Sequence, residues 1–354
     1  MHVGIIEPER LKQIPSSLHS AHEFCFFLHD QIVHLLSQLE ASGVKQVQVK
    51  LSSEAESKSF AETEDVFLWL ETHHYGNTLK ELIINETALA LFTDASHFLF
   101  EGLKALEKRK FAVAFALFRK PLKENLLLAA WLLAEPNTFY QHMAQLDGRT
   151  INSTIEPSRR REILRKAASL LDNVDQSTID LIERSFFERS GPDGFASVFD
   201  KATHLTTSHK RYSTEPLNLN FIFLDPRSDH LYHQFYPVLI FAICFLLRVQ
   251  MKIYSTIQPT NPNVERWLNF AMIGVHHSLF ASGKSVIAKW LNELFADQLV
   301  CTSCDTGKAL RKTDLPKLFL AEKFACLNCG CVNSFPLFWL MTRAFDYEDT
   351  NKHC

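Results

Sequence analysis

Glycine and proline are scarce in this chain. Its 354 residues include 11 Gly and 13 Pro, against 29 Phe. Folds built from many short strands depend on turns rich in Gly and Pro, so this composition argues against them. Long helices with bulky side-chain contacts are favoured, and we expect a mainly α protein.

Cysteine is almost absent before residue 300, where only Cys25 and Cys244 occur. The opening sequence MHVGIIEPERLKQIP has no basic segment followed by an apolar one, so no secretory signal is expected. We therefore expect a cytoplasmic protein. In that reducing compartment, closely spaced cysteines bind metal more often than they form disulfides.

Several catalytic signatures are missing as well. The sequence has no GxxxxGK[ST] loop, no GxGxxG after a strand, no GxSxG elbow and no HExxH. P-loop nucleotide hydrolysis, dinucleotide redox chemistry, α/β-hydrolase chemistry and zincin chemistry therefore lack their physical parts. A net charge of −3 and a pI near 6.6 give no overall attraction to nucleic acid, so such binding requires a local basic face.

Long apolar runs are also lacking. The most apolar one, FYPVLIFAICFLL at residues 235–247, has 13 residues and contains Pro237. A membrane-spanning helix needs about 20 apolar residues. We expect a buried core helix here and no membrane partner.

Helical periodicity is the main pattern that is present. Pro157 stands at the expected first position of one helix, and Pro121 is expected to kink another. The alternating segment VKQVQVKL at residues 44–51 predicts a short strand. Helices are expected at about residues 16–42, 78–110, 111–135, 157–173, 177–190, 225–254, 263–282, 285–300 and 336–345.

Five cysteines gather near the C-terminus, in CTSC at residues 301–304 and CLNCGC at residues 326–331. Two CxxC turns supply the four thiolates that tetrahedral zinc prefers, and the spacing between them is close to that of known zinc sites. We expect one Zn²⁺ per chain, held by the following four residues: Cys301, Cys304, Cys326 and Cys329.

Two alternatives remain open for this cluster. Cys331 is either a spare thiol or a replacement for Cys329 as ligand. A four-iron cluster also takes four thiolates, although its cysteines more often occur as three closely spaced residues and a distant fourth.

The paired CxxC and CxxCG turns resemble a zinc-ribbon module over about residues 299–335. That resemblance implies a structural metal. Since four thiolates leave no coordination position for water, the zinc is expected to stabilise the fold without catalysing a reaction.

A basic segment, SRRREILRK, lies at residues 158–166. On a helix its cations are spaced to form a face that follows the phosphates of a nucleic acid, with RNA the favoured ligand. The candidate binding residues are Arg159, Arg160, Arg161, Arg165 and Lys166.

In the segment RSDHLYH, five residues separate Arg227 from His233. Such an arginine can stabilise a phosphorane-like anion, and a histidine can transfer protons near neutral pH. The helical texture of residues 80–255 is similar to that of bacterial HEPN-like proteins of stress response and phage defence. This resemblance implies a metal-independent ribonuclease that uses Arg227 and His233, often completed across a homodimer.

Together these patterns predict a multi-helix bundle with a small C-terminal four-cysteine zinc ribbon. We expect a helical domain at residues 1–298, with an internal boundary near 191–220, and a zinc ribbon plus C-terminal helix at 299–354. The expected function is a nucleic-acid or protein interaction module with structural zinc, in bacterial stress response or phage defence. The alternative is the HEPN-like ribonuclease.

Overall fold

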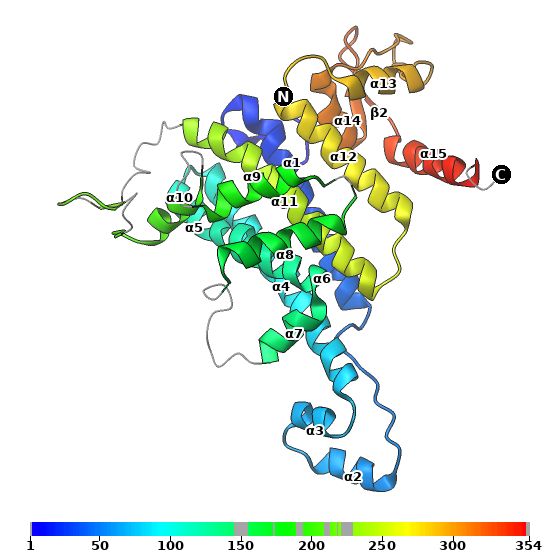
Figure 1. Ribbon diagram of the computed structural model, residues 1–354. Coiled ribbons are helices and arrows are strands. Elements are labelled where there is room, and N and C mark those ends of the chain that lie inside the picture. Colours follow the sequence, from blue (N-terminus) through cyan, green and yellow to red (C-terminus); the bar gives the residue numbers. More distant parts are fainter. Residues whose placement is uncertain are drawn as a thin grey trace.

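The computed structural model of the chain describes residues 2–144, 155–172, 174–188, 194–208, 213–217, 219–220 and 229–351, with side chains described as far as residue 345. In these ranges the chain forms a bundle of helices with one two-stranded sheet near the C-terminus (Figure 1). The predicted mainly α fold class is confirmed.

The α-helices are α1 (His19–Ala41), α2 (Glu54–Glu62), α3 (Val66–Thr72), α4 (Gly76–Glu107), α5 (Phe111–Arg119), α6 (Leu126–Ala134), α7 (Pro136–Ala144), α8 (Pro157–Ser169), α9 (Gln176–Ile182), α10 (Ala196–Thr203), α11 (Asp229–Ile257), α12 (Pro262–Phe280), α13 (Val286–Leu294), α14 (Leu315–Ala321) and α15 (Leu337–Asn351). The strands are β1 (Lys323–Ala325) and β2 (Val332–Ser334), paired antiparallel. Two π-helical segments are η3 (Lys120–Asn125) and η5 (Glu183–Phe187), and short 3-10 turns are Pro8–Leu11, Ser16–Leu18 and Lys312–Asp314.

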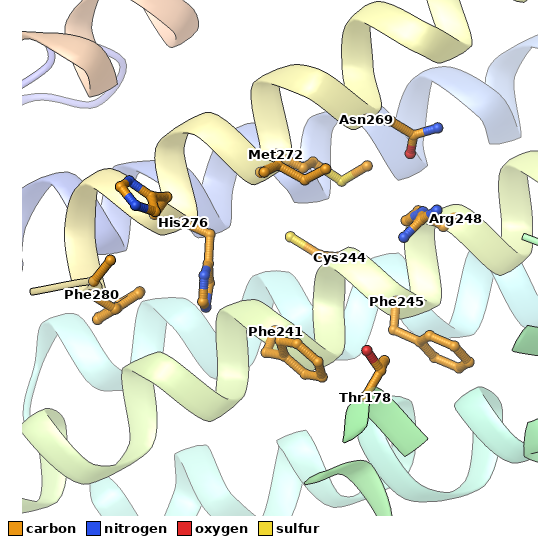
Figure 2. A pocket seen from close by; sticks show the side chains of 12 residues that line it. Thr178, Phe241, Cys244, Phe245, Arg248, Asn269, Met272, His276 and Phe280 are labelled. Carbon is orange, nitrogen blue, oxygen red and sulfur yellow. The ribbon is translucent and has the colours of Figure 1, made fainter. Parts of the chain in front are cut away.

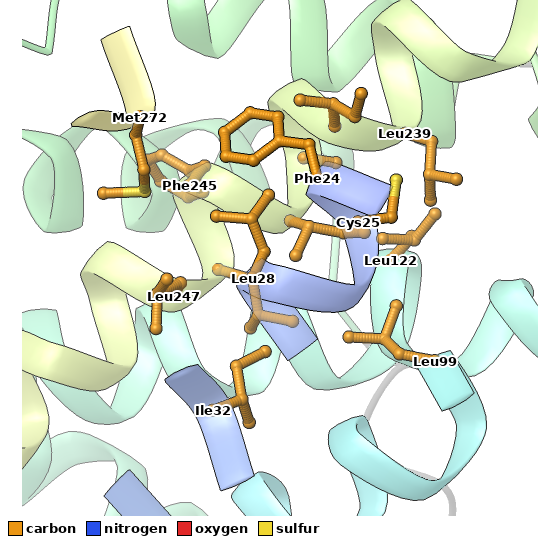
Figure 3. Packing of buried hydrophobic residues seen from close by; sticks show 14 of the residues in the cluster. Phe24, Cys25, Leu28, Ile32, Leu99, Leu122, Leu239, Phe245, Leu247 and Met272 are labelled. Carbon is orange, nitrogen blue, oxygen red and sulfur yellow. The ribbon is translucent and has the colours of Figure 1, made fainter. Parts of the chain in front are cut away.

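Helices α1, α4 and α11 pack together at the centre of the molecule. Phe24, Leu28 and Ile32 lie one turn apart on α1 and are fully buried (Figure 3). Because these side chains follow the i, i+4 spacing, one face of α1 faces the core along its length. Each such side chain contributes about 1.5–3 kcal/mol of hydrophobic stabilisation.

Helix α11 has 29 residues, contains the 13-residue apolar run and continues through Pro237. Among the described residues it is the one helix long and apolar enough to cross a membrane. However, 61% of its most apolar window is buried inside the fold, against α1, α6 and α12 among others. It is the central core helix of this bundle.

Proline positions explain two further helix features. Pro157 occupies the first position of α8, as predicted. The predicted kink at Pro121 takes the form of the π-helical segment η3, which joins α5 to α6. Proline cannot donate a backbone hydrogen bond, and a π turn accommodates this loss without ending the helical path.

Two local predictions are wrong. Residues 44–51 do not form a strand, because no strand in the described part of the chain pairs with them. Val49 and Leu51 instead pack against the cluster of Trp69, Leu70 and Leu79. The helix expected to begin at about residue 16 begins later, because Ser16–Leu18 form a 3-10 turn and α1 starts at His19. The start of the helix expected from residue 225 lies outside the described residues.

Helices α2 and α3 form an arm at the lower end of the bundle in Figure 1. The arm has its own small cluster around Trp69, Leu70 and Leu79, separate from the main core. Its side chains stack closely: the rings of Trp69 and Tyr75 lie 5.6 Å apart.

The cysteine region packs on α12. Phe319 of α14 lies against the rings of Trp267 (5.7 Å) and Phe270 (5.3 Å) of α12. Gly274 of α12 allows this close approach, because an added Cβ would lie 2.7 Å from the Phe319 ring. The buried side chains of the cysteine region and the helical bundle therefore form one continuous cluster.

Candidate metal centre

Four cysteine sulfur atoms converge at the C-terminal module. The Sγ atoms of Cys301 and Cys329 lie 3.5 Å apart, and those of Cys304 and Cys326 lie 3.7 Å apart. All four sulfurs lie within 4.8 Å of one another. Each pair joins one CxxC turn to the other, so the cluster ties together two segments that are distant in sequence.

Backbone hydrogen bonds form each turn. In the first, Asp305 donates to the carbonyl of Cys301 and adopts a positive φ of 53°. In the second, Gly330 donates to the carbonyl of Cys326 with a φ of 76°, as expected for a glycine at this position. The turns bring the two sulfurs of each CxxC to one side of the backbone.

The β strands carry the second turn. In the segment KLFLAEKFA, the first residues belong to α14 and only Lys323–Ala325 is extended, as β1. Glu322 links the two with a left-handed conformation of φ 51°. Strand β1 then pairs with β2, and the second CxxC lies in the connection between them.

Asn333 joins the two turns and was not predicted from the sequence. Its buried side chain accepts hydrogen bonds from the backbone amide and the hydroxyl of Thr302, at 2.9 and 3.0 Å. Its amide group donates to the Cys331 carbonyl at 3.1 Å and lies 3.6 Å from the Cys301 sulfur. The only sign of this role in the sequence is that Asn333 stands two residues after Cys331.

Hydrogen-bond donors around the sulfurs favour thiolates. The hydroxyl and backbone amide of Thr306, with the side chain of Asn328, lower the pKa of Cys304 to about 6. The backbone amide of Ser303 chiefly lowers the pKa of Cys301. The backbone amide of Cys331 lowers the pKa of Cys329, but hydrogen bonds with the side chains of Cys301 and Cys304 outweigh it and raise that pKa. Because thiolates are the form that binds metal, the lowered pKa values prepare Cys301 and Cys304 for a cation.

The geometry fits one metal ion. A tetrahedral zinc with bonds of about 2.3 Å places its sulfur ligands about 3.8 Å apart, close to the two distances above. A disulfide requires sulfurs about 2.05 Å apart, and a four-iron cluster separates its thiolates by its own iron and sulfide atoms. Four sulfurs around one point therefore favour a single ion over either alternative.

Cys331 is exposed and does not belong to the four-sulfur cluster, which contains Cys329. Its carbonyl accepts a hydrogen bond from the backbone amide of Cys326 at 2.9 Å. Its backbone thus helps to shape the second turn, while the thiol is left outside the cluster.

The five predicted nucleic-acid-binding cations lie on α8, as expected, but four of them contact carboxylates. Arg159 and Lys166 share Glu135, and both also reach Glu162. Arg160 pairs with Glu183, and Arg161 with Glu188. Arg165 is exposed. The segment is therefore a network of ion pairs more than an unopposed positive face.

The predicted catalytic pair is only partly described. His233 is exposed near the start of α11. Arg227 lies outside the described residues, so the separation of the two side chains stays a prediction.

A buried polar network, which the sequence did not predict, lies around Glu107. The guanidinium group of Arg10 donates to both carboxylate oxygens of Glu107. His22 lies between Glu107 (3.4 Å) and the hydroxyl of Tyr236 (2.6 Å). Burial lowers the pKa of His22, so the neutral imidazole is favoured, accepting from Tyr236 and donating to Glu107.

Comparison of the chain with protein-family models, curated proteins and solved structures finds no match. The expected likeness to HEPN proteins therefore gains no support from these comparisons. The four-cysteine cluster remains the feature of the site that the structure bears out.

Proposed function

We propose that this protein is an interaction protein whose C-terminal module is held together by one structural Zn²⁺ and binds a partner protein. The observation that carries the proposal is an exposed apolar stripe on α13, beside the cysteine cluster. The four thiolates would fill the coordination shell of the ion, so the metal would have no position left for a reacting water.

The stripe consists of Val286, Trp290 and Leu294, which are 74%, 41% and 46% exposed. They lie four residues apart and so occupy one face of α13. The opposite face is anchored by the buried residues Ala288 and Leu291. Contiguous exposed apolar side chains on a helix are typical of protein-binding surfaces, and Trp is enriched among residues that dominate binding energy.

The cysteine module positions this stripe. Asn292 of α13 donates to the carbonyl of Leu310 at 2.9 Å and accepts from its backbone amide at 2.7 Å. Leu310 follows the first CxxC turn, so the metal-binding segment and α13 are joined by a two-point contact. Trp290 in addition packs edge-on against Phe270 of α12, with ring centres 5.7 Å apart.

A protein partner is favoured over RNA because the cations of the basic segment on α8 largely have carboxylate partners. RNA binding through Arg165 and its neighbours remains the alternative expected from the sequence. The part in bacterial stress response or phage defence, and the cytoplasmic location, also stay predictions. Thiolate ligands suit a reducing compartment.

A photo-crosslinking amino acid placed at position 290, in cells that express the protein, tests the proposal. We expect a discrete protein adduct at position 290. The matched control carries the same amino acid in place of the exposed Arg165 and should give no adduct. Val286→Asp combined with Leu294→Asp should abolish the adduct. A yield of adduct at position 290 no higher than that at position 165 would contradict the proposal. An adduct that ribonuclease removes would indicate that the partner is RNA.

Ribonuclease activity is the second candidate, and the exposure of His233 favours it. A proton-transferring histidine must reach a macromolecular substrate, and this position on α11 is open to solvent. Incubation of the purified protein with total RNA should then give cleavage that His233→Ala abolishes, while His97→Ala, at an exposed position of α4, leaves it unchanged. Absence of cleavage, or cleavage unaffected by His233→Ala, rejects this candidate.

A further inference from the structure

A cavity of about 470 Å³ lies between α11 and α12, with Thr178 of α9 at its edge (Figure 2). Its size is within the range of about 300–1,000 Å³ that small-molecule sites occupy. The metal centre and the α13 stripe lie outside it, so the cavity concerns an activity beyond the proposed function.

The walls of the cavity are mainly apolar. Phe241 and Phe245 come from α11, and Met272 and Phe280 from α12. Cys244 lies between the two helices, and burial raises its pKa to about 12, so the thiol is neutral and acts as part of the apolar wall. The side chains leave a space suited to an apolar chain or ring system.

One end of the cavity carries a cation. Arg248 donates to the backbone carbonyl of Asp172 and forms no ion pair with a carboxylate in the part of the chain described here. Burial lowers the pKa of Arg248. This effect outweighs the opposite effect of nearby Cys244, Asp172 and Glu265, which raise it. Even so, the guanidinium group stays charged at neutral pH, and a partly buried charge of this kind is stabilised by an anionic partner.

Asn269 lies at the same end, across the gap from Arg248 (Figure 2). Its side-chain oxygen is buried without a hydrogen-bond partner among the described residues. Buried polar atoms are nearly always hydrogen-bonded, so an unpartnered amide facing a cavity points to a ligand or water. Rotation of the amide allows it to donate to the same group that Arg248 binds.

Two histidines, His276 and His277, also line the cavity. His276 lies between the rings of Phe241 (6.1 Å) and Phe280 (5.2 Å). Burial lowers its pKa, so the imidazole is neutral near pH 7. Nδ1 of His277 is buried without a hydrogen-bond partner among the described residues, so the cavity has a second polar group besides Asn269, while the guanidinium charge lies at the Arg248 end.

We propose that this cavity binds a fatty carboxylate, with the carboxylate on Arg248 and Asn269 and the apolar chain extending along the cavity towards Phe280. A single guanidinium matches a carboxylate in a bidentate pair. A phosphate with two charges would leave one of them unpaired in an apolar site, which disfavours it.

Calorimetric titration of the full chain with dodecanoate tests the headgroup, with dodecanol, dodecylammonium and dodecyl phosphate as matched ligands below their micellar concentrations. Dodecanoate should bind with one-to-one stoichiometry, and each of the other three at least about 10-fold more weakly, as expected for loss of a charge-assisted hydrogen bond. No binding of dodecanoate, or binding no tighter than that of dodecanol or dodecyl phosphate, would overturn the proposal.

Two variants test the location. Arg248→Gln should weaken dodecanoate binding at least about 10-fold and leave dodecanol binding nearly unchanged. Ile273→Trp, at a lining position that is 50% exposed, should block both ligands without disturbing the core, and it decides the location if Arg248→Gln does not fold. Arg165→Gln on α8 is the control and should bind as the wild type does. Unchanged dodecanoate affinity in Ile273→Trp or in folded Arg248→Gln would place the ligand elsewhere.

Discussion

The sulfur atoms of Cys304 and Cys326 lie 3.7 Å apart although 22 positions separate the two residues in the chain. Together with the pair formed by Cys301 and Cys329, this contact closes the C-terminal module around one point. Metal binding to such a cluster is coupled to folding, because the ligands converge only in the folded state. The effects of removing the metal should therefore be confined largely to this module.

Replacement of Cys326 by Ser should loosen the C-terminal module and leave the core of the bundle folded. We expect faster amide hydrogen exchange in α14, β1 and β2, with little change in α4, since the α1–α4–α11 core does not depend on the cluster. Hydrogen exchange read by mass spectrometry measures both regions in one experiment. Cys331→Ser is the matched control, and an equal effect of that substitution would assign a ligand role to Cys331.

Arg160 is expected to support the fold. Its Nε and Nη2 atoms donate to the two carboxylate oxygens of Glu183, at 3.1 and 3.2 Å, and the Glu183 side chain is only 2% exposed. Arg160→Ala would leave that carboxylate buried without its partner and should lower the free energy of unfolding by about 3 kcal/mol. The same substitution at exposed Arg165 should change it by less than about 0.5 kcal/mol. Urea denaturation compares the two, and equal losses would contradict this account.

Gly274 is expected to be essential for the contact between α12 and α14. Gly274→Ala places a methyl group 2.7 Å from the buried ring of Phe319, so the ring or the helix must shift. We expect a loss of about 1–3 kcal/mol in thermal or urea unfolding. At Gly76, where an added Cβ meets nothing within 4 Å, the same change should be neutral or stabilising.

Acidification should destabilise the protein through His22. Burial lowers its pKa below the ordinary value of 6.5, so the folded state binds this proton less readily than the unfolded state does. The stability that neutral His22 provides is complete above pH 6.5 and is lost as the pH falls below that value towards the lowered pKa. One proton of difference gives a slope of at most about 1.4 kcal/mol per pH unit.

Urea denaturation between pH 7.5 and pH 5 measures this slope. His22→Asn should show a smaller slope than the wild type in the same range, whereas exposed His233→Asn should keep the wild-type slope. A wild-type slope retained in His22→Asn would mean that other groups, such as His276, account for the pH dependence.

The sequence predicted those features that depend on local spacing. Helical periodicity located the main helices, Pro157 marked the start of α8, and the two CxxC turns identified the four cysteines of the cluster. Features that depend on distant contacts were not predictable. The strand expected at residues 44–51 had no neighbouring strand to pair with, which an alternating pattern alone does not reveal.

Polar contacts between distant segments were likewise not predictable from the sequence. The carboxylates that pair with the α8 cations include Glu135 and Glu183, which come from other segments, so the sequence showed a basic face where the fold has ion pairs. The role of Asn333, and the position of Arg248 in a cavity, likewise arise only when separate elements pack together. A single sequence gives no signal for such contacts.

Elemental analysis of the purified protein tests the central claim most directly. We predict one zinc ion per chain in the wild type and in Cys331→Ser, and much less than one in Cys304→Ser and Cys326→Ser. Absence of zinc from the folded wild-type protein, or full zinc content in the Cys304→Ser and Cys326→Ser variants, would contradict the account.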